Sequence, residues 1–187
     1  DAGVTPLSVR VPGKMMLLGE YAVLEGASAL CAGVARYATG WRIEEREDES
    51  PVDEAVRARV EQELGPCDIG KRINNGSIRK GSNKLGIGSS SAAAVAAAAL
   101  FSGRIDDEVR TWAVDGHRTA AGGRGSGIDV ATSFVGGLVV AGRQPGPVRK
   151  LDFQWRDYTL HVLFMVDSAS TAELVSKAKS APSWPKL

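Results

Sequence analysis

The sequence predicts an α+β fold of about one domain, with strands and helices interleaved irregularly rather than in strict βαβ order. Apolar and polar residues alternate from Leu7 to Val11, which is the period of a strand. Between Val52 and Leu64 a valine or leucine recurs every four residues, which is the spacing of an amphipathic helix. Both periods occur within 187 residues, of which 43% are hydrophobic and 24% charged, as in an ordinary globular domain.

The first half of the chain predicts several strands and one helix with a clear start. Pro12-Gly13 is expected to end the first strand, and further strands are expected at 29–34 and 41–44. After a charged turn, Ser50-Pro51-Val52-Asp53 has the order of a helix N-terminus: a serine cap, a proline at the first position and an acid three residues after the cap. Asn75-Gly76 lies near β-branched residues on both sides, which predicts a type I′ hairpin.

The second half predicts three helices and two strands. Helices are expected at 89–101 and at 106–120, the latter with three acids at its start. Strands are expected at 138–141 and 158–166. Ser170-Thr171-Ala172-Glu173 is a second capping-box match and predicts a last helix that runs through Val175.

Composition excludes several classes of function. The formal net charge of +1 gives no reason to expect nucleic acid or an anionic membrane as a partner. The two cysteines, Cys31 and Cys67, form no C-x-x-C pair, so neither a disulfide framework nor a zinc site is expected. There is no apolar run of membrane-spanning length and no secretory leader at Asp1, so we expect a cytoplasmic protein.

Two familiar nucleotide-binding patterns are rejected. Residues 65–71, GPCDIGK, fit the first seven places of a Walker A loop, but Arg72 stands where the magnesium-binding serine or threonine must be. We interpret this stretch as a helix-ending turn. No G-x-G-x-x-G follows a predicted strand, so a Rossmann site is not expected.

The most unusual stretch is KLGIGSSSAAAVAAAALF, residues 84–101, where glycines and serines lead into an alanine-rich helix. The first N–H groups of a helix have no partner within it, and the helix dipole places partial positive charge there. Gly86 and Gly88 would let the backbone approach a ligand, and Ser89, Ser90 and Ser91 would add hydroxyl donors. Together they predict a cradle for phosphate. The alternative is a simple cap on a helix of small residues.

Two other glycine-punctuated stretches strengthen the phosphate interpretation. VPGKMMLLGEYAVLEG places Lys14 just after Pro-Gly, and GSGIDVATSFVGG places Asp129 just after a glycine-serine loop. Each alone has an ordinary explanation, a solvent-facing lysine or a helix-capping aspartate. A lysine, a serine cluster and an aspartate on three such loops are the parts that phosphoryl transfer uses.

In order along the chain, these three motifs resemble those of the GHMP-family small-molecule kinases, which include galactokinase, homoserine kinase, mevalonate kinase and phosphomevalonate kinase. The resemblance runs from about Val9 to Val175. GEYAVLEG, GHRTAAGGRGSGIDVA and SASTAELV resemble phosphomevalonate kinases more than mevalonate kinases. The family resemblance implies that residues 1–187 form the family's N-terminal domain, which has the ribosomal protein S5 domain 2-like fold. The family's second domain, which carries a third glycine-rich motif, is not expected in these residues.

The resemblance also implies roles for individual residues, with ATP and Mg²⁺ as cofactors. Lys14 and Asp129 would be catalytic, and Ser90 would bind the metal. His117 stands where mevalonate kinases carry an acidic metal ligand; an imidazole suits Mg²⁺ poorly, so it would contact substrate or pack as a polar core residue. The phosphate-binding set would be Lys84, Gly86, Gly88, Ser89, Ser90 and Ser91, and the acceptor-binding set Glu20, Tyr21, Ser126 and His117.

Phosphorylation of mevalonate 5-phosphate by ATP is the function that the resemblance implies, with a small molecule as the only expected partner. Two alternatives stay open. One is a mevalonate kinase or another kinase of small alcohols, and the other is a non-catalytic module that binds a nucleotide or metabolite. Retention of Lys14 and Asp129 favours an enzyme.

Overall fold

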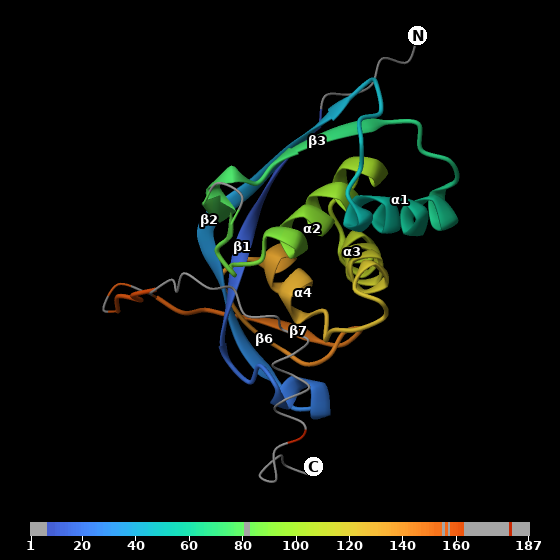
Figure 1. Ribbon diagram of the computed structural model, residues 1–187. Helices are drawn as coiled ribbons and strands as arrows, with labels where there is room; N and C mark the ends of the chain where they lie inside the picture. The colour runs from blue at the N-terminus through green and yellow to red at the C-terminus, as the bar shows by residue number, and fades with distance from the viewer. Residues whose placement is uncertain (1–6, 81–82, 155, 157, 163–179, 181–187) are drawn as a thin grey trace.

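A computed structural model describes residues 7–80, 83–154, 156, 158–162 and 180 of the chain. An antiparallel sheet forms one layer, and four helices cover one of its faces (Figure 1). The fold is therefore α+β, as predicted. The strands of the main sheet are β1 (Ser8–Leu18), β2 (Ala29–Ile43), β3 (Gly70–Asn74), β6 (Leu138–Ala141) and β7 (Val148–Leu151); β4 (Arg79–Lys80) and β5 (Asn83–Lys84) form a separate pair.

Strand β2 organises the sheet. Most of its length, from Leu30 to Trp41, pairs with β1 on one side, while on the other side its first residues pair with β6 and its last residues with β3. Cys31 thus lies opposite Val139 of β6, and Gly40 lies opposite Ile73 of β3. Strand β7 adds to the outer edge of β6. This arrangement brings segments that are a hundred residues apart to the same sheet.

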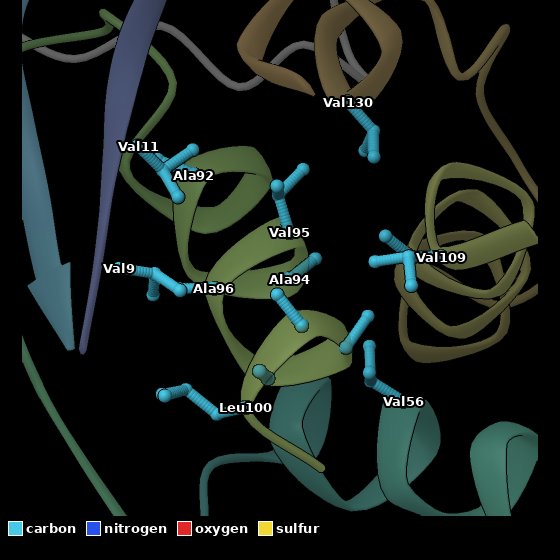
Figure 2. Close-up of a cluster of buried hydrophobic side chains, with 14 of the residues drawn as sticks. Val9, Val11, Val56, Ala92, Ala94, Val95, Ala96, Leu100, Val109 and Val130 are labelled. Atoms are coloured by element: carbon cyan, nitrogen blue, oxygen red, sulfur yellow. The ribbon is translucent and has the colours of Figure 1, made fainter. Parts of the chain in front are cut away.

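The helices are α1 (Pro51–Leu64), α2 (Ser89–Ser102), α3 (Asp107–Ala120) and α4 (Ile128–Val135), with a short 3₁₀ turn η1 at Ala22–Glu25 and another, η2, at Gly76–Ile78. Helix α2 is central, since it contacts strands β1 and β2 as well as the other three helices. Figure 2 shows its side chains among Val9 and Val11 of β1, Val56 of α1, Val109 of α3 and Val130 of α4. Most of its alanines are fully buried, and their small side chains let α2 pack closely on every side.

The local signals for helices are confirmed. Ser50 and Asp53 form a complete capping box, in which the Ser50 hydroxyl accepts from Asp53 N and the Asp53 carboxylate accepts from Ser50 N. Asp106 caps α3, which begins one residue later than predicted. Val109, Trp112 and Ala113 form the buried side of that helix.

Several predicted boundaries are wrong. The first strand does not end at Pro12-Gly13, because the pairing with β2 shifts its register there and continues to Leu18. The two strands predicted at 29–34 and 41–44 are one strand. Asn75-Gly76 makes no hairpin: residues Gly76–Ile78 form a 3₁₀ turn, and β3 pairs with β2 rather than with the strand that follows. Helix α4 and strand β7 were not predicted.

The C-terminal predictions are tested only in part. Residues 158–162 have no regular secondary structure, so the strand predicted at 158–166 is wrong over its first five residues, and its remainder lies outside the described residues. The helix predicted to start at Ser170 also lies outside them. None of the described helices is both long and apolar enough to span a bilayer.

Candidate functional site

The start of α2 has the backbone geometry of an anion site. Gly88 is its N-cap residue and has φ +80°, a left-handed conformation that favours glycine. Among the described residues no side chain caps this helix, and the first intrahelical bond runs from Ala92 N to Gly88 O (3.0 Å). The N–H groups of the first turn therefore point out of the helix end with the positive end of its dipole.

The three serines of this turn face different surroundings. Ser91 is fully buried; its hydroxyl donates to Gly88 O (2.9 Å) and lies 3.3 Å from the Ser133 hydroxyl. Ser89 is also buried. Ser90 is half-buried, and its Oγ lies 3.1 Å from Nε2 of His117. The Ser90 hydroxyl is thus the best placed of the three to meet a ligand, while a phosphate-binding role for the Ser91 side chain is not favoured.

Lys14 lies directly beside this helix start. Its backbone N–H donates to Ile87 O (2.9 Å), which ties β1 to the loop before α2. A Cβ atom on Gly88 would stand 2.9 Å from Cγ of Lys14 and 3.2 Å from its backbone nitrogen. A side chain at position 88 would therefore displace the lysine, so the glycine allows the stem of Lys14 to pack against the mouth of α2.

Asp129 lies in the first turn of α4, whose N-cap residue Gly127 has φ +76°. The charges of Asp129 and Lys14 both act on one buried thiol, that of Cys31. Burial raises the pKa of Cys31; a hydrogen bond with Thr132 and the charge of Lys14 act to lower that pKa, and the charges of Asp129 and Glu20 act to raise it. Helix α4 packs against strand β1 and against α2, so Asp129 and Lys14 are carried on neighbouring elements.

The other predicted residues are less closely gathered. Ser126 is buried, and its hydroxyl accepts from Ile128 N (3.4 Å), so it acts as part of the start of α4. Glu20 is exposed, and Tyr21 is the half-buried residue before η1. Gly86 is exposed with φ +74°. Lys84 belongs to β5, but its side chain is outside the described part of the structure.

Sequence reasoning missed Arg118, the residue after His117. Its guanidinium donates to the backbone carbonyl groups of Gln144 (2.7 Å), Ser126 (3.4 Å) and Gly125 (3.4 Å). These partners lie 7 to 26 residues further along the chain. Only the position of Arg118 next to His117, within the motif GHRTAAGGRGSGIDVA, could have drawn attention to it.

The rejected Walker-like stretch is confirmed as a turn. Gly65 is the C-cap residue of α1, and the stretch leads into strand β3 rather than into a helix. Nζ of Lys71 lies 2.8 Å from the Asp53 carboxylate in a buried ion pair, so this lysine is not available to a phosphate. Residues 65–69 line a cleft of about 290 Å³ together with Phe101 and Ser102, at the opposite end of α2 from Gly88.

Residues 50–137 match the family model described as the GHMP kinases N terminal domain. A search of curated proteins found no match. Among solved structures, the fold is similar to the Lin0012 protein of Listeria innocua (TM-score 0.78, 22% identity, 94% of this chain and 65% of that one) and to the mevalonate kinase of Methanococcus jannaschii (TM-score 0.71, 16% identity, 98% and 69%).

It is also similar to the phosphomevalonate kinase of Streptococcus pneumoniae, solved in complex with phosphomevalonate and AMPPNP (TM-score 0.60, 20% identity, 72% of this chain and 49% of that one). The chain thus spans between about half and about two thirds of the length of these three structures. The matched residues include two of the three motifs, at 84–101 and 125–137, so over this range the resemblance to the family is confirmed.

Proposed function

We propose that this chain, whose residues 50–137 match the N-terminal domain of the GHMP kinases, is the nucleotide-binding part of an ATP-dependent kinase whose acceptor is mevalonate 5-phosphate. The observation that carries the proposal is the position of Lys14. Its stem packs against Gly88 at the start of α2, and α4, whose first turn carries Asp129, packs against both α2 and the strand of Lys14. A cation, a carboxylate and a helix N-terminus are therefore carried on elements that pack together.

The start of α2 would hold the nucleotide phosphates. Its first N–H groups, which have no partner within the helix, and the helix dipole favour an anion, and the left-handed glycine at position 88 keeps the backbone approachable. The Ser90 hydroxyl, half-buried at the same turn, adds a further donor. ATP supplies the phosphoryl group, and this turn would keep its negative charge in position.

With a phosphate acceptor, Lys14 would make the largest catalytic contribution, by neutralising negative charge. A phosphomonoester has a second pKa near about 6, so at neutral pH it is already mostly ionised and needs no general base. The difficulty is to bring two anions together, which calls for a positive charge between them. Lys14 supplies that charge at the mouth of α2.

Asp129 would have a different role with each acceptor. With an alcohol such as mevalonate, the hydroxyl proton must leave, and a carboxylate can accept it. With a phosphate acceptor no such proton needs to leave, and Asp129 would instead orient Lys14 or a metal ion. The order of importance of Lys14 and Asp129 is therefore diagnostic of the acceptor.

The site offers too few protein ligands to hold Mg²⁺ alone, so phosphate oxygens of the nucleotide would have to complete its coordination. The described residues contain no cluster of three histidine, cysteine or acidic side chains that could hold a metal by themselves. The oxygens of Ser90 and Asp129 suit Mg²⁺, which is often held by one or two protein oxygens plus substrate phosphates. The ion would neutralise charge on the transferred phosphate.

The chain would act as the N-terminal domain of a two-domain kinase in the cytoplasm. It spans 49% of the length of the streptococcal phosphomevalonate kinase. Both cysteines are free thiols, which accords with a reducing compartment. A second domain would supply further contacts to the nucleotide.

A coupled ADP-release assay tests the function directly. Mevalonate and mevalonate 5-phosphate are offered side by side to the 187-residue chain, and to the same chain with whatever its reading frame encodes beyond Leu187. ADP release that depends on mevalonate 5-phosphate supports the proposal. ADP release with mevalonate but not with mevalonate 5-phosphate assigns the alcohol as acceptor. Nucleotide binding without turnover points to a non-catalytic module. If the chain neither binds the nucleotide nor turns it over, the kinase assignment is refuted.

A further inference from the structure

The last turn of α3 lies between the two helix starts that carry the proposed site residues. His117 contacts Ser90 at the start of α2. The next residue, Arg118, donates to the carbonyl groups of Gly125 and Ser126, in the loop that leads into α4. Neighbouring residues of one helical turn therefore touch both places where the site is built.

The Arg118 guanidinium binds only backbone carbonyl groups among its described hydrogen bonds. Nη2 donates to Gln144 O and Ser126 O, and Nε donates to Gly125 O. Gln144 N also donates to Ser126 O (2.7 Å). A rigid, planar guanidinium can hold several acceptors at fixed angles, which an ammonium cannot. Arg118 thereby fastens the loop to α3 and to the segment around Gln144, whose side chain is itself buried.

Residues 121–127 need a restraint from outside because their glycine-rich backbone can adopt many conformations. Gly122, Gly123, Gly125 and Gly127 all have positive φ, and residues 121–125 are exposed. Glycine restricts the backbone less than any other residue. Gly127 is the N-cap of α4 and Asp129 is the second residue of that helix, so movement of the loop would move the carboxylate.

We propose that Arg118 is a positioning residue for phosphoryl transfer: its guanidinium fixes residues 125–127, and this keeps Asp129 in place relative to Lys14. The inference rests on the proposed function, because it is the reaction that needs a precisely placed carboxylate. A displacement of about 1 Å in an active site can cost about 100-fold in rate. Arg118 itself need not touch a substrate.

Three variants test the proposal. Arg118→Lys keeps the positive charge but loses the fork, and Arg118→Ala removes both. The matched control is Arg110→Lys. Arg110 lies on the same helix and donates to the side chain of Gln144 (2.8 Å), but its described hydrogen bonds do not reach residues 125–127. All three are compared with the wild type by kcat, KM for ATP and hydrogen exchange of the amides of residues 126–130.

Arg118→Lys is expected to lower kcat about 10- to 100-fold while KM for ATP changes by less than about threefold, because the α2 phosphate site is untouched. Amide exchange of residues 126–130 should become about 10-fold faster in Arg118→Lys and stay unchanged in Arg110→Lys. Equal losses of kcat in the two lysine variants would overturn the proposal, as would faster exchange with unchanged kcat.

The exchange measurement needs no substrate and so separates the two proposals. Unchanged exchange in both Arg118 variants overturns the role of Arg118 even if the wild type is an active kinase. A wild type without any turnover refutes the proposed function and the catalytic consequence with it, while exchange still decides whether Arg118 restrains the loop.

Discussion

Replacing Gly88 by alanine tests the geometry at the start of α2, and Gly86 offers an unusually close control. The two glycines are two residues apart and have nearly the same left-handed backbone, with φ +80° and +74°. They differ in what a new methyl group would meet. At Gly88 it would stand 2.7 Å from the Ser91 hydroxyl and 2.9 Å from Cγ of Lys14, whereas at Gly86 nothing lies within 4 Å.

The magnitudes follow from these two contributions. A left-handed conformation costs an L-residue about 1–2 kcal/mol, and both variants should lose this much free energy of unfolding. Overpacking in a tight site costs about 1–3 kcal/mol more, and only Gly88→Ala should incur it. Lys14 has a flexible stem and can move aside. This movement relieves part of the overpacking but shifts the ammonium group. We therefore expect Gly88→Ala to be the less stable variant by about 1–2 kcal/mol.

Urea unfolding of both variants measures the stability difference, and ADP release measures the effect on the site. Gly88→Ala should lose at least about 10-fold more activity than Gly86→Ala, because the methyl group displaces Lys14 and crowds the N–H groups that would hold phosphate. Equal stability and equal activity of the two variants would refute the close approach of Lys14 to Gly88, and with it the geometry on which the proposed function depends.

Three further predictions use the charges and the buried thiol. With mevalonate 5-phosphate as acceptor, Lys14→Ala should lower kcat more than Asp129→Asn in single-turnover kinetics; the reverse order would indicate an alcohol acceptor. Burial opposes ionisation of Glu49, but its bonds to Arg57 (Nε to Oε2, 2.9 Å) outweigh this and lower its pKa. Its stabilising effect should therefore be present above about pH 4.3, its unfolded pKa, and fade as the pH falls through the lower folded pKa, so urea unfolding of wild type and Glu49→Gln should converge in acid. Burial raises the pKa of Cys31, so iodoacetamide at pH 8 should alkylate it about 100-fold more slowly in the folded chain than in denaturant, as mass spectrometry can follow; equal rates would contradict its burial.

Helix starts could be predicted from the sequence because their causes are local. The capping box of Ser50 and Asp53 is complete within four residues, and Asp106 caps α3 through N–H groups two and three residues away. The alanine-rich helix also appears where its composition placed it. In each case the residues that determine the structure are neighbours in the chain.

Strand boundaries were mispredicted because their causes are distant. Pro12 ends a strand only where its missing N–H is needed, but among the described strands β1 pairs with β2 alone and so lies at the edge of the sheet. Asn75-Gly76 would close a hairpin if β3 had its successor as partner, yet Thr39–Ile43 of β2 already occupies that strand. Competition between partners far apart in sequence cannot be read from a turn motif.

The site was predicted unevenly for the same reason. The motifs located Lys14, Gly88 and Asp129; in the structure Lys14 lies against Gly88, and Asp129 lies on a helix that packs against the strand of Lys14. They could not reveal that Ser91 turns inward to bond Gly88 O, since three identical serines differ only in their direction from the helix axis. Nor could they indicate Arg118, whose partners are carbonyl groups of other segments.

The alanines of α2 connect the fold to the site. A central helix that touches a sheet and three other helices must be narrow, and Ala92, Ala94 and Ala96 are each fully buried (Figure 2). Larger side chains would push α2 away from β1, and the distance between its first turn and Lys14 would grow with them. The close contact at Gly88 therefore depends on small residues along the length of the helix as well as on the glycine itself. The alanine-rich stretch at 84–101 therefore determines how closely the start of α2 approaches Lys14.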